Sequence, residues 1–155
     1  MRIRVWDALV RVLHWTLAGA VATGLISGHW PPSHFDDWHH TAGYVAAAAI
    51  VLRLVWGLRG SRYARLSQFV RSPRTVLAYA RALRTGQEPR YIGHNPLGGW
   101  MIVLLMVTLL GVGASGWLYT TDEYWGVAWV EHLHEGLANF LLLLIALHVA
   151  GVIFT

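Results

Sequence analysis

The sequence predicts an all-α integral membrane protein: a four-helix bundle with a short amphipathic helix between its second and third spans. The chain has 155 residues, of which 55% are hydrophobic and 13% are charged, and its mean hydropathy is +0.45. This composition is unlike that of soluble domains. Four apolar stretches reach about 20 residues, the length of helix that crosses a bilayer. We place them at residues 8–28, 38–58, 97–119 and 132–154, and we expect residues 1–155 to form a single domain with no internal repeat or linker.

The first apolar stretch is expected to stay in the protein as a span. It contains Arg11 and His14, and no small-residue cleavage site follows it, as a secretory signal peptide would require. The chain contains no cysteine. Disulfides, cysteine-ligated iron–sulfur clusters and covalently attached haem are therefore excluded for this chain.

The charges predict the orientation. All 12 basic residues are arginines. Three precede or begin the first span, and nine lie from the last two turns of the second span to the start of the third: Arg2, Arg4, Arg11, Arg53, Arg59, Arg62, Arg65, Arg71, Arg74, Arg81, Arg84 and Arg90. The other two loops carry acidic residues instead: Asp36, Asp37, Asp122, Glu123 and Glu131. The positive-inside rule then puts both termini and the long loop in the cytoplasm. The formal charge of +4 reflects topology and contact with anionic lipid, not nucleic-acid binding.

The long loop predicts a helix of its own. Ser72-Pro73 is a helix start, with a capping serine and a proline in the first turn, and Gly86 is a stop signal. Apolar side chains alternate between them with arginines, as in a helix lying on the inner leaflet. The turn Gly93-His94-Asn95-Pro96 leads into the third span. The tryptophans cluster near the predicted interfaces.

Two histidines on the last span predict metal ligands at two depths. His134 and His148 are 14 residues apart, which at about 100° per residue returns to nearly the same helix face, ~21 Å along the axis. In the predicted topology His39 lies at the outer depth of His134, and His14 lies at the inner depth of His148. Each pair comes from two helices, as axial ligation of a flat macrocycle requires. Two such centres at different depths would carry electrons across the bilayer. Bis-histidine iron has no vacant coordination position, which suits electron transfer more than oxygen binding.

Other histidines compete for these roles. His132 lies 16 residues before His148, on the opposite face. His40 competes with His39, and spacing does not separate them. His29 and His34, in the outer loop, are expected to be exposed. A lone membrane histidine is as often a hydrogen-bonding or proton-relay group as a ligand.

Small and charged residues near these histidines suit a haem. Gly43 follows His39 by one turn, so a ring would pack against bare backbone there. Arg53 lies on the same face as His39 at the inner end, where it would hold a haem propionate or, as an alternative, reach phospholipid. Arg11, one turn from His14, is a second candidate for the propionate.

Several motifs along the whole chain resemble the bacterial four-helix di-haem cytochrome b family, which includes the cytochrome b subunit of membrane-bound nickel–iron hydrogenase. They are Val5-Trp6-Asp7, His14-Trp15, His39 with Gly43-Tyr44, Arg53-Leu54-Val55-Trp56-Gly57, Arg62-Tyr63-Ala64-Arg65, Gly93-His94-Asn95-Pro96, and His134-Glu135 followed by His148. The resemblance implies two non-covalent b haems with ligands His14, His39, His134 and His148. It also favours His39 over His40.

The resemblance further implies a multi-pass protein of the bacterial inner membrane, an electron-transfer subunit exchanging electrons between the quinone pool and a periplasmic or membrane-anchored redox partner. That partner would be a c-type cytochrome or a hydrogenase-like subunit, in a larger complex or oligomer. Alternatives are a stand-alone quinol oxidoreductase using superoxide or oxygen, and a haem-free anchor subunit. Family members usually carry a basic cytoplasmic tail after the fourth span, whereas this chain stops at Thr155. We therefore expect either a missing tail or a less enclosed inner quinone pocket.

The two ends predict two contact sites. The polar groups of His94 and Asn95 would meet a quinone at the inner face, unless this turn only caps the third span. The outer surface would dock the partner or serve as a structural lid; it carries Asp122, Glu123, Trp125, Trp129 and Glu131.

Overall fold

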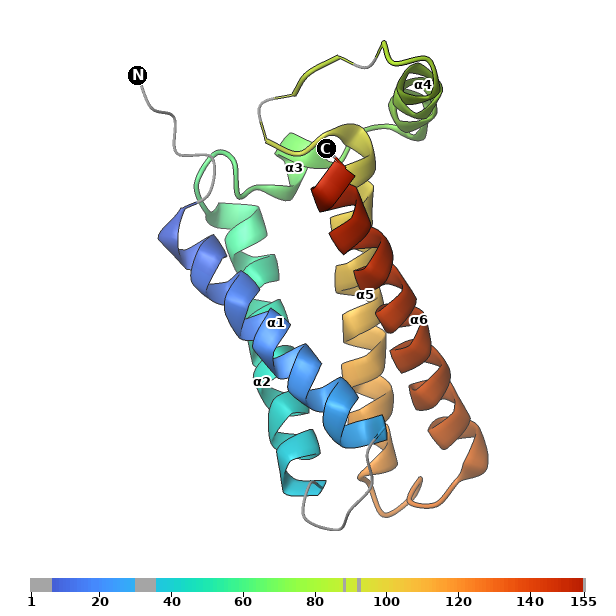
Figure 1. The fold of residues 1–155 in the computed structure, drawn as a ribbon. Helices are drawn as coiled ribbons and strands as arrows, with labels where there is room; N and C mark the ends of the chain where they lie inside the picture. The colour runs from blue at the N-terminus through green and yellow to red at the C-terminus, as the bar shows by residue number, and fades with distance from the viewer. Residues whose placement is uncertain (1–6, 30–35, 88, 92, 155) are drawn as a thin grey trace.

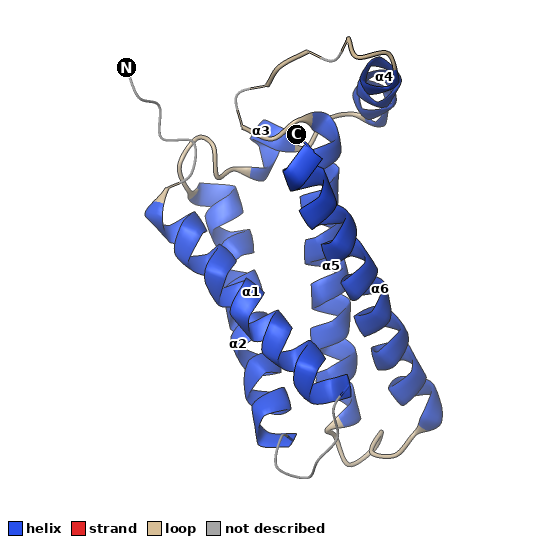
Figure 2. Cartoon of the chain, viewed as in Figure 1, coloured by secondary structure: helices blue, strands red, loops and turns tan. Residues whose placement is uncertain are grey.

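The computed structural model describes residues 7–29, 36–87, 89–91 and 93–154, and these residues form helices joined by loops, with no strand among them (Figures 1 and 2). The helices are α1 (Ala8–His29), α2 (Asp36–Arg59), α3 (Leu66–Phe69), α4 (Pro73–Arg84), α5 (Pro96–Tyr119) and α6 (Ala128–Phe154). Four of them, α1, α2, α5 and α6, are long and apolar enough to cross a membrane. The predicted all-α class and its four spans are confirmed.

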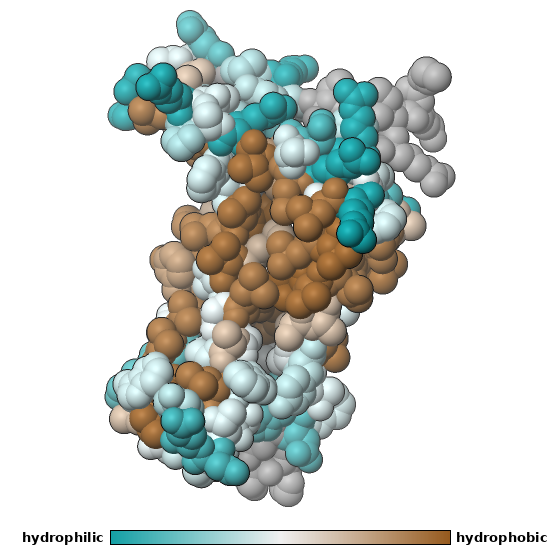
Figure 3. All heavy atoms as spheres, turned by 180° about the vertical axis from the view of Figure 1, so that it is seen from behind, coloured by the Kyte–Doolittle hydropathy of each residue, from teal (hydrophilic) through white to brown (hydrophobic). Residues whose placement is uncertain are grey.

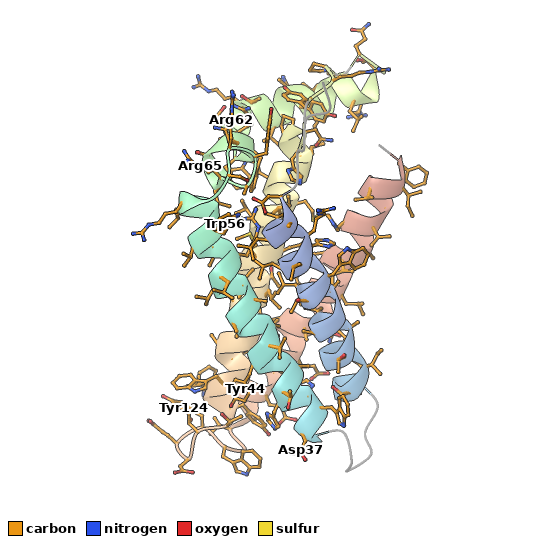
Figure 4. The ribbon with its side chains drawn as sticks, turned by 90° about the vertical axis from the view of Figure 1, so that its left-hand side faces the viewer. Asp37, Tyr44, Trp56, Arg62, Arg65 and Tyr124 are labelled. Atoms are coloured by element: carbon orange, nitrogen blue, oxygen red, sulfur yellow. The ribbon has the colours of Figure 1, made fainter. Side chains whose placement is uncertain are left out.

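The bundle consists of two helical hairpins. α1 packs along α2, α5 packs along α6, and the two hairpins meet mainly through α2 and α5 (Figure 1). The short helices α3 and α4 lie at the end where α1 begins and α6 finishes. We call this the arginine-rich end, because it carries Arg62 and Arg65, and the opposite end, with Asp37, the acidic end (Figure 4).

Small residues let the hairpins pack closely. Ala42, Ala46, Ala49 and Ile50 form a buried row along α2 at helical spacing. Close backbone approach of this kind is how membrane helices associate, because lipid provides no hydrophobic drive between them. The outer faces carry exposed apolar side chains, and these form a hydrophobic belt between two polar ends on the face drawn in Figure 3.

Local signals fix the helix ends as predicted. The Ser72 hydroxyl accepts a hydrogen bond from the Thr75 amide and begins α4, and Gly86 has a positive φ of 66° just after it. The Asn95 side-chain oxygen accepts from the Gly98 amide at 2.7 Å, with Pro96 in the first turn of α5.

Two features differ from the sequence-based expectation. α6 begins at Ala128, one turn before the expected residue 132, because the Val127 carbonyl already accepts the amides of Val130 and Glu131. The short helix α3 was not predicted. It holds buried Phe69 against α5, where a Cβ on Gly99 would lie 2.3 Å from the Phe69 carbonyl oxygen.

Asp7 joins the start of α1 to the end of α2. One carboxylate oxygen accepts from the Val10 amide at 2.8 Å and caps α1, and the other accepts from the Trp56 indole at 2.9 Å and from the Ser61 hydroxyl. Partial burial raises the pKa of Asp7, but these hydrogen bonds and the charge of Arg53 outweigh it. The net pKa lies below the ordinary 3.8.

We expect Asp7→Ala to lower the free energy of unfolding by about 1–3 kcal/mol, because a helix cap and two further hydrogen bonds to a charged group are lost. The carboxylate is favoured in the folded state. Its contribution is therefore complete above pH 3.8 and is lost as the pH falls through the lower folded-state pKa. Thermal unfolding in detergent measures both effects. The control is Asp37→Ala, an exposed change at the start of α2, and equal loss in the two variants would contradict the role of Asp7.

Candidate functional site

His39 and His134 face each other near the acidic end. His39 lies in the second turn of α2 and His134 in the second turn of α6, and their ring centroids are 6.0 Å apart with an interplanar angle of 79°. Two imidazoles that each place a nitrogen about 2 Å from one metal atom have centroids roughly 6 Å apart. The spacing of this pair therefore fits two axial ligands of one metal.

Backbone carbonyls set the tautomer of both rings. His39 Nδ1 lies 3.0 Å from the Gly24 carbonyl oxygen of α1, and His134 Nδ1 lies 3.1 Å from the Val112 carbonyl oxygen of α5. A carbonyl only accepts, so each Nδ1 carries the hydrogen and donates it. The Nε2 lone pair of each ring is then left for a metal, the arrangement usual for ligating histidines.

The structure separates these two histidines from their sequence neighbours. His40 and His132 are exposed, whereas His39 and His134 are half-buried. His29 is exposed, and its Nδ1 donates to the Leu25 carbonyl at 2.9 Å within α1. His34 lies outside the described residues.

His14 and His148 form a second pair towards the arginine-rich end. His14 lies in the second turn of α1 and His148 in the last two turns of α6, and the two rings interact electrostatically. Both are half-buried, and the indole of Trp15 lies edge-on to His14 at 5.5 Å between centroids. The structure thus places the rings of His39 and His134 opposite each other near one end, and it places His14 and His148 within electrostatic range of each other towards the other end.

Arg53 is the one buried arginine of the described residues, with 9% of its surface exposed. It interacts electrostatically with Asp7 and with His94, and its Nη1 donates no hydrogen bond to a described residue. A buried cation without such a bond is costly. This position therefore suits an anionic group brought by a ligand, and its burial disfavours the alternative of phospholipid contact.

The other two predicted contacts are less enclosed. Arg11 is exposed and lies with Trp15 and Thr16 on an open surface of α1. Gly43 is also exposed, and a Cβ there would meet no atom of the described residues within 4 Å.

A small cavity of about 70 Å³ lies at the arginine-rich end, between α3 and the turn before α5. His94, Tyr63, Gln68, Arg71 and Tyr91 contribute to its lining. Burial lowers the pKa of His94 below its ordinary 6.5, and the charges of Arg53 and His148 lower it further. His94 is therefore neutral at pH 7. The sequence indicated His94 as a candidate but not Tyr63, Gln68 or Tyr91, because no local signal indicates that α3 lies against the turn before α5.

The donor sets fit a macrocyclic metal cofactor. The described residues contain no cluster of three or more histidine, cysteine, aspartate or glutamate side chains able to hold a bare ion. A haem needs only two axial ligands from the protein, since the porphyrin supplies four nitrogens. One pair of histidines between membrane helices supplies the two ligands that a b-type haem requires from the protein.

The fold and this site define a multi-pass membrane cytochrome of the b type. The sequence model of the family described as prokaryotic cytochrome b561 matches residues 5–155, and the chain belongs to that family. Membership implies b-type haem and electron transfer within the membrane. No curated protein and no solved structure matches the chain.

Proposed function

We propose that the chain binds two b haems, the first between His39 and His134 and the second between His14 and His148, and transfers electrons across the membrane. The observation that carries the proposal is the His39–His134 pair, with centroids 6.0 Å apart and both Nδ1 hydrogens donated to backbone carbonyls. The second pair, His14 on α1 and His148 on α6, consists of two half-buried histidines that interact electrostatically. When bound, haem supplies one-electron redox chemistry at each pair.

Arg53 would hold a propionate of the haem near the arginine-rich end. Its guanidinium is buried, and its Nη1 donates no hydrogen bond to the described residues. A carboxylate there would form a charge-assisted hydrogen bond and repay the cost of burying the cation. Asp7 does not serve as this partner by hydrogen bonding, because its oxygens accept from Val10, Trp56 and Ser61.

The haem content of the purified protein tests the proposal. A pyridine haemochrome assay is expected to give about two haems per chain, one for each histidine pair. One haem would mean that one pair has another role, and no haem would favour a membrane anchor without redox function.

The arginine-rich end would face the cytoplasm of a bacterial inner membrane, because eight of the twelve arginines lie from Arg59, the last residue of α2, to the start of α5. In this orientation the cavity beside His94 lies at the inner face, where we place the quinone. His94 is neutral and half-buried, so it can accept the proton that a quinol gives off, and its protonated form can give a proton to a reduced quinone. The Asn95 side-chain oxygen caps α5 by accepting from the Gly98 amide. We therefore assign the contact with the quinone to His94 alone.

We expect His94→Gln to slow electron exchange with quinone by about 100-fold, the usual contribution of a proton-transferring side chain, while the haem content stays unchanged. Stopped-flow oxidation of the reduced protein by a soluble quinone measures it. His29→Gln is the matched control, since His29 is exposed at the acidic end. Equal rates in the wild type and His94→Gln would move the quinone site elsewhere.

The acidic end would meet the redox partner, a c-type cytochrome or a hydrogenase-like subunit. The segment between α5 and α6 and the start of α6 expose Asp122, Glu123, Trp125, Trp129 and Glu131 (Figure 4 marks Tyr124 in this segment). Exposed acidic and aromatic side chains suit a basic partner surface. Stacking of Trp125 on Tyr119, with centroids 5.7 Å apart, also fits the alternative of a structural lid.

A further inference from the structure

The surroundings of His39 and His134 are duplicated. Each Nδ1 lies beside a carbonyl of the neighbouring helix, and the serine three residues further along that helix lies beside the same nitrogen. In α1 these groups are the Gly24 carbonyl and Ser27 Oγ, at 3.0 and 3.3 Å from His39 Nδ1. In α5 they are the Val112 carbonyl and Ser115 Oγ, both at 3.1 Å from His134 Nδ1.

A glycine follows each serine and contacts the same ring. A Cβ on Gly28 would lie 3.1 Å from His39 Cε1, and a Cβ on Gly116 would lie 2.9 Å from His134 Cε1. Real Cβ atoms are almost never as close as 2.9 Å, and a distance of 3.1 Å is tighter than nine in ten real Cβ contacts. Each imidazole therefore rests on bare backbone. The dipeptide Ser-Gly thus occurs at equivalent positions of the two hairpins.

The serine hydroxyls are oriented to accept from the histidines. Ser27 Oγ lies 2.7 Å from the Thr23 carbonyl, and Ser115 Oγ lies 2.8 Å from the Gly111 carbonyl, each four residues earlier in its helix. The hydroxyl hydrogen is donated to that carbonyl. A lone pair of the oxygen therefore faces Nδ1, and the Nδ1 hydrogen is shared between a carbonyl and a hydroxyl.

We propose that Ser27 and Ser115 are positioning residues that jointly set the reduction potential of the haem held by His39 and His134. This inference rests on the proposed ligand pair. An acceptor at Nδ1–H makes the opposite nitrogen a stronger electron donor, which favours ferric iron and lowers the potential. Because the two serines act on opposite ligands of one haem, their effects add.

Spectroelectrochemical titration of Ser27→Ala, Ser115→Ala and the double variant tests the inference. At the wild-type midpoint potential of this haem, each single variant is expected to raise the ferrous-to-ferric ratio about two- to tenfold, which is the contribution of one neutral hydrogen bond. The double variant should show the product of the two single changes. The other haem should keep its potential.

Two further variants separate this effect from a structural one. Ser115→Thr keeps the hydroxyl and is expected to restore the wild-type potential. Thr23→Ala is the matched control: Thr23 also donates to the carbonyl four residues earlier, Gly19 at 2.9 Å, one turn before Ser27. It should leave both potentials unchanged.

The outcomes distinguish this inference from the proposed function. Two haems with potentials unchanged in both alanine variants would overturn the serine role and leave the ligand assignment intact. A wild-type protein without a haem at His39 and His134, shown by haem content, would instead refute the assignment. If Ser115→Ala loses the haem, recovery in Ser115→Thr supports the inference, and failure to recover overturns it.

Discussion

His134→Ala is expected to reduce the haem content from about two per chain to about one. The variant removes one of the two imidazoles proposed to hold the haem near the acidic end. Only His39 is then left, and we expect that a single axial ligand does not retain the haem through purification. The pair on α1 and α6 lies towards the other end of the bundle, so its haem should stay. The pyridine haemochrome assay gives the count, and the ferric electron paramagnetic resonance spectrum shows which of two low-spin signals disappears.

The chain offers a control two residues away. His132→Ala removes an exposed imidazole from the same turn of α6, and it should keep both haems. His39→Ala and His40→Ala form the corresponding pair on α2, where only the first should lose a haem. Loss of a haem in His132→Ala, with none lost in His134→Ala, would show that the face assignment of α6 is wrong.

The helices and their ends could be predicted because their signals are local. Four apolar stretches long enough to span a bilayer define α1, α2, α5 and α6, and capping residues such as Ser72 and Asn95 lie next to the helices that they begin. The predicted amphipathic helix coincides with α4, from Pro73 to Arg84. α3 was not predicted because its four residues are held in place by a long-range contact, the packing of Phe69 against α5.

The candidate site could be predicted only in part, for the same reason. Helical periodicity distinguishes His134 from His132, which lie on different faces of α6. It does not distinguish His39 from His40, because these two are adjacent near the start of α2. What separates them is the Gly24 carbonyl of another helix. The roles of Ser27 and Ser115 also depend on helix pairing. A repeated Ser-Gly dipeptide is too short to be recognised as an internal repeat until both copies are seen against a histidine.

Gly116→Ala is expected to weaken or abolish the haem at His39 and His134, although it only adds a methyl group. The new Cβ would lie 2.9 Å from His134 Cε1 and 3.2 Å from its Nδ1. The ring must then move away from Val112 and Ser115, whose oxygens hold its Nδ1 hydrogen. Overpacking of this kind costs about 1–3 kcal/mol, which corresponds to haem affinity lower by about 5- to 150-fold.

Gly28→Ala should have the same effect to a smaller degree, since its Cβ would lie 3.1 Å from His39 Cε1 and a shift of a few tenths of an ångström relieves the contact. The control is Gly136→Ala, which lies two residues from His134 but has no atom of the described residues within 4 Å of the added Cβ. It should keep the wild-type haem content. Haem retention during dialysis against apomyoglobin ranks the variants, and the expected order of loss is Gly116→Ala, Gly28→Ala, then Gly136→Ala equal to wild type. If Gly116→Ala retained its haem as well as Gly136→Ala does, close support of the histidine ring by bare backbone would have no part in holding the cofactor.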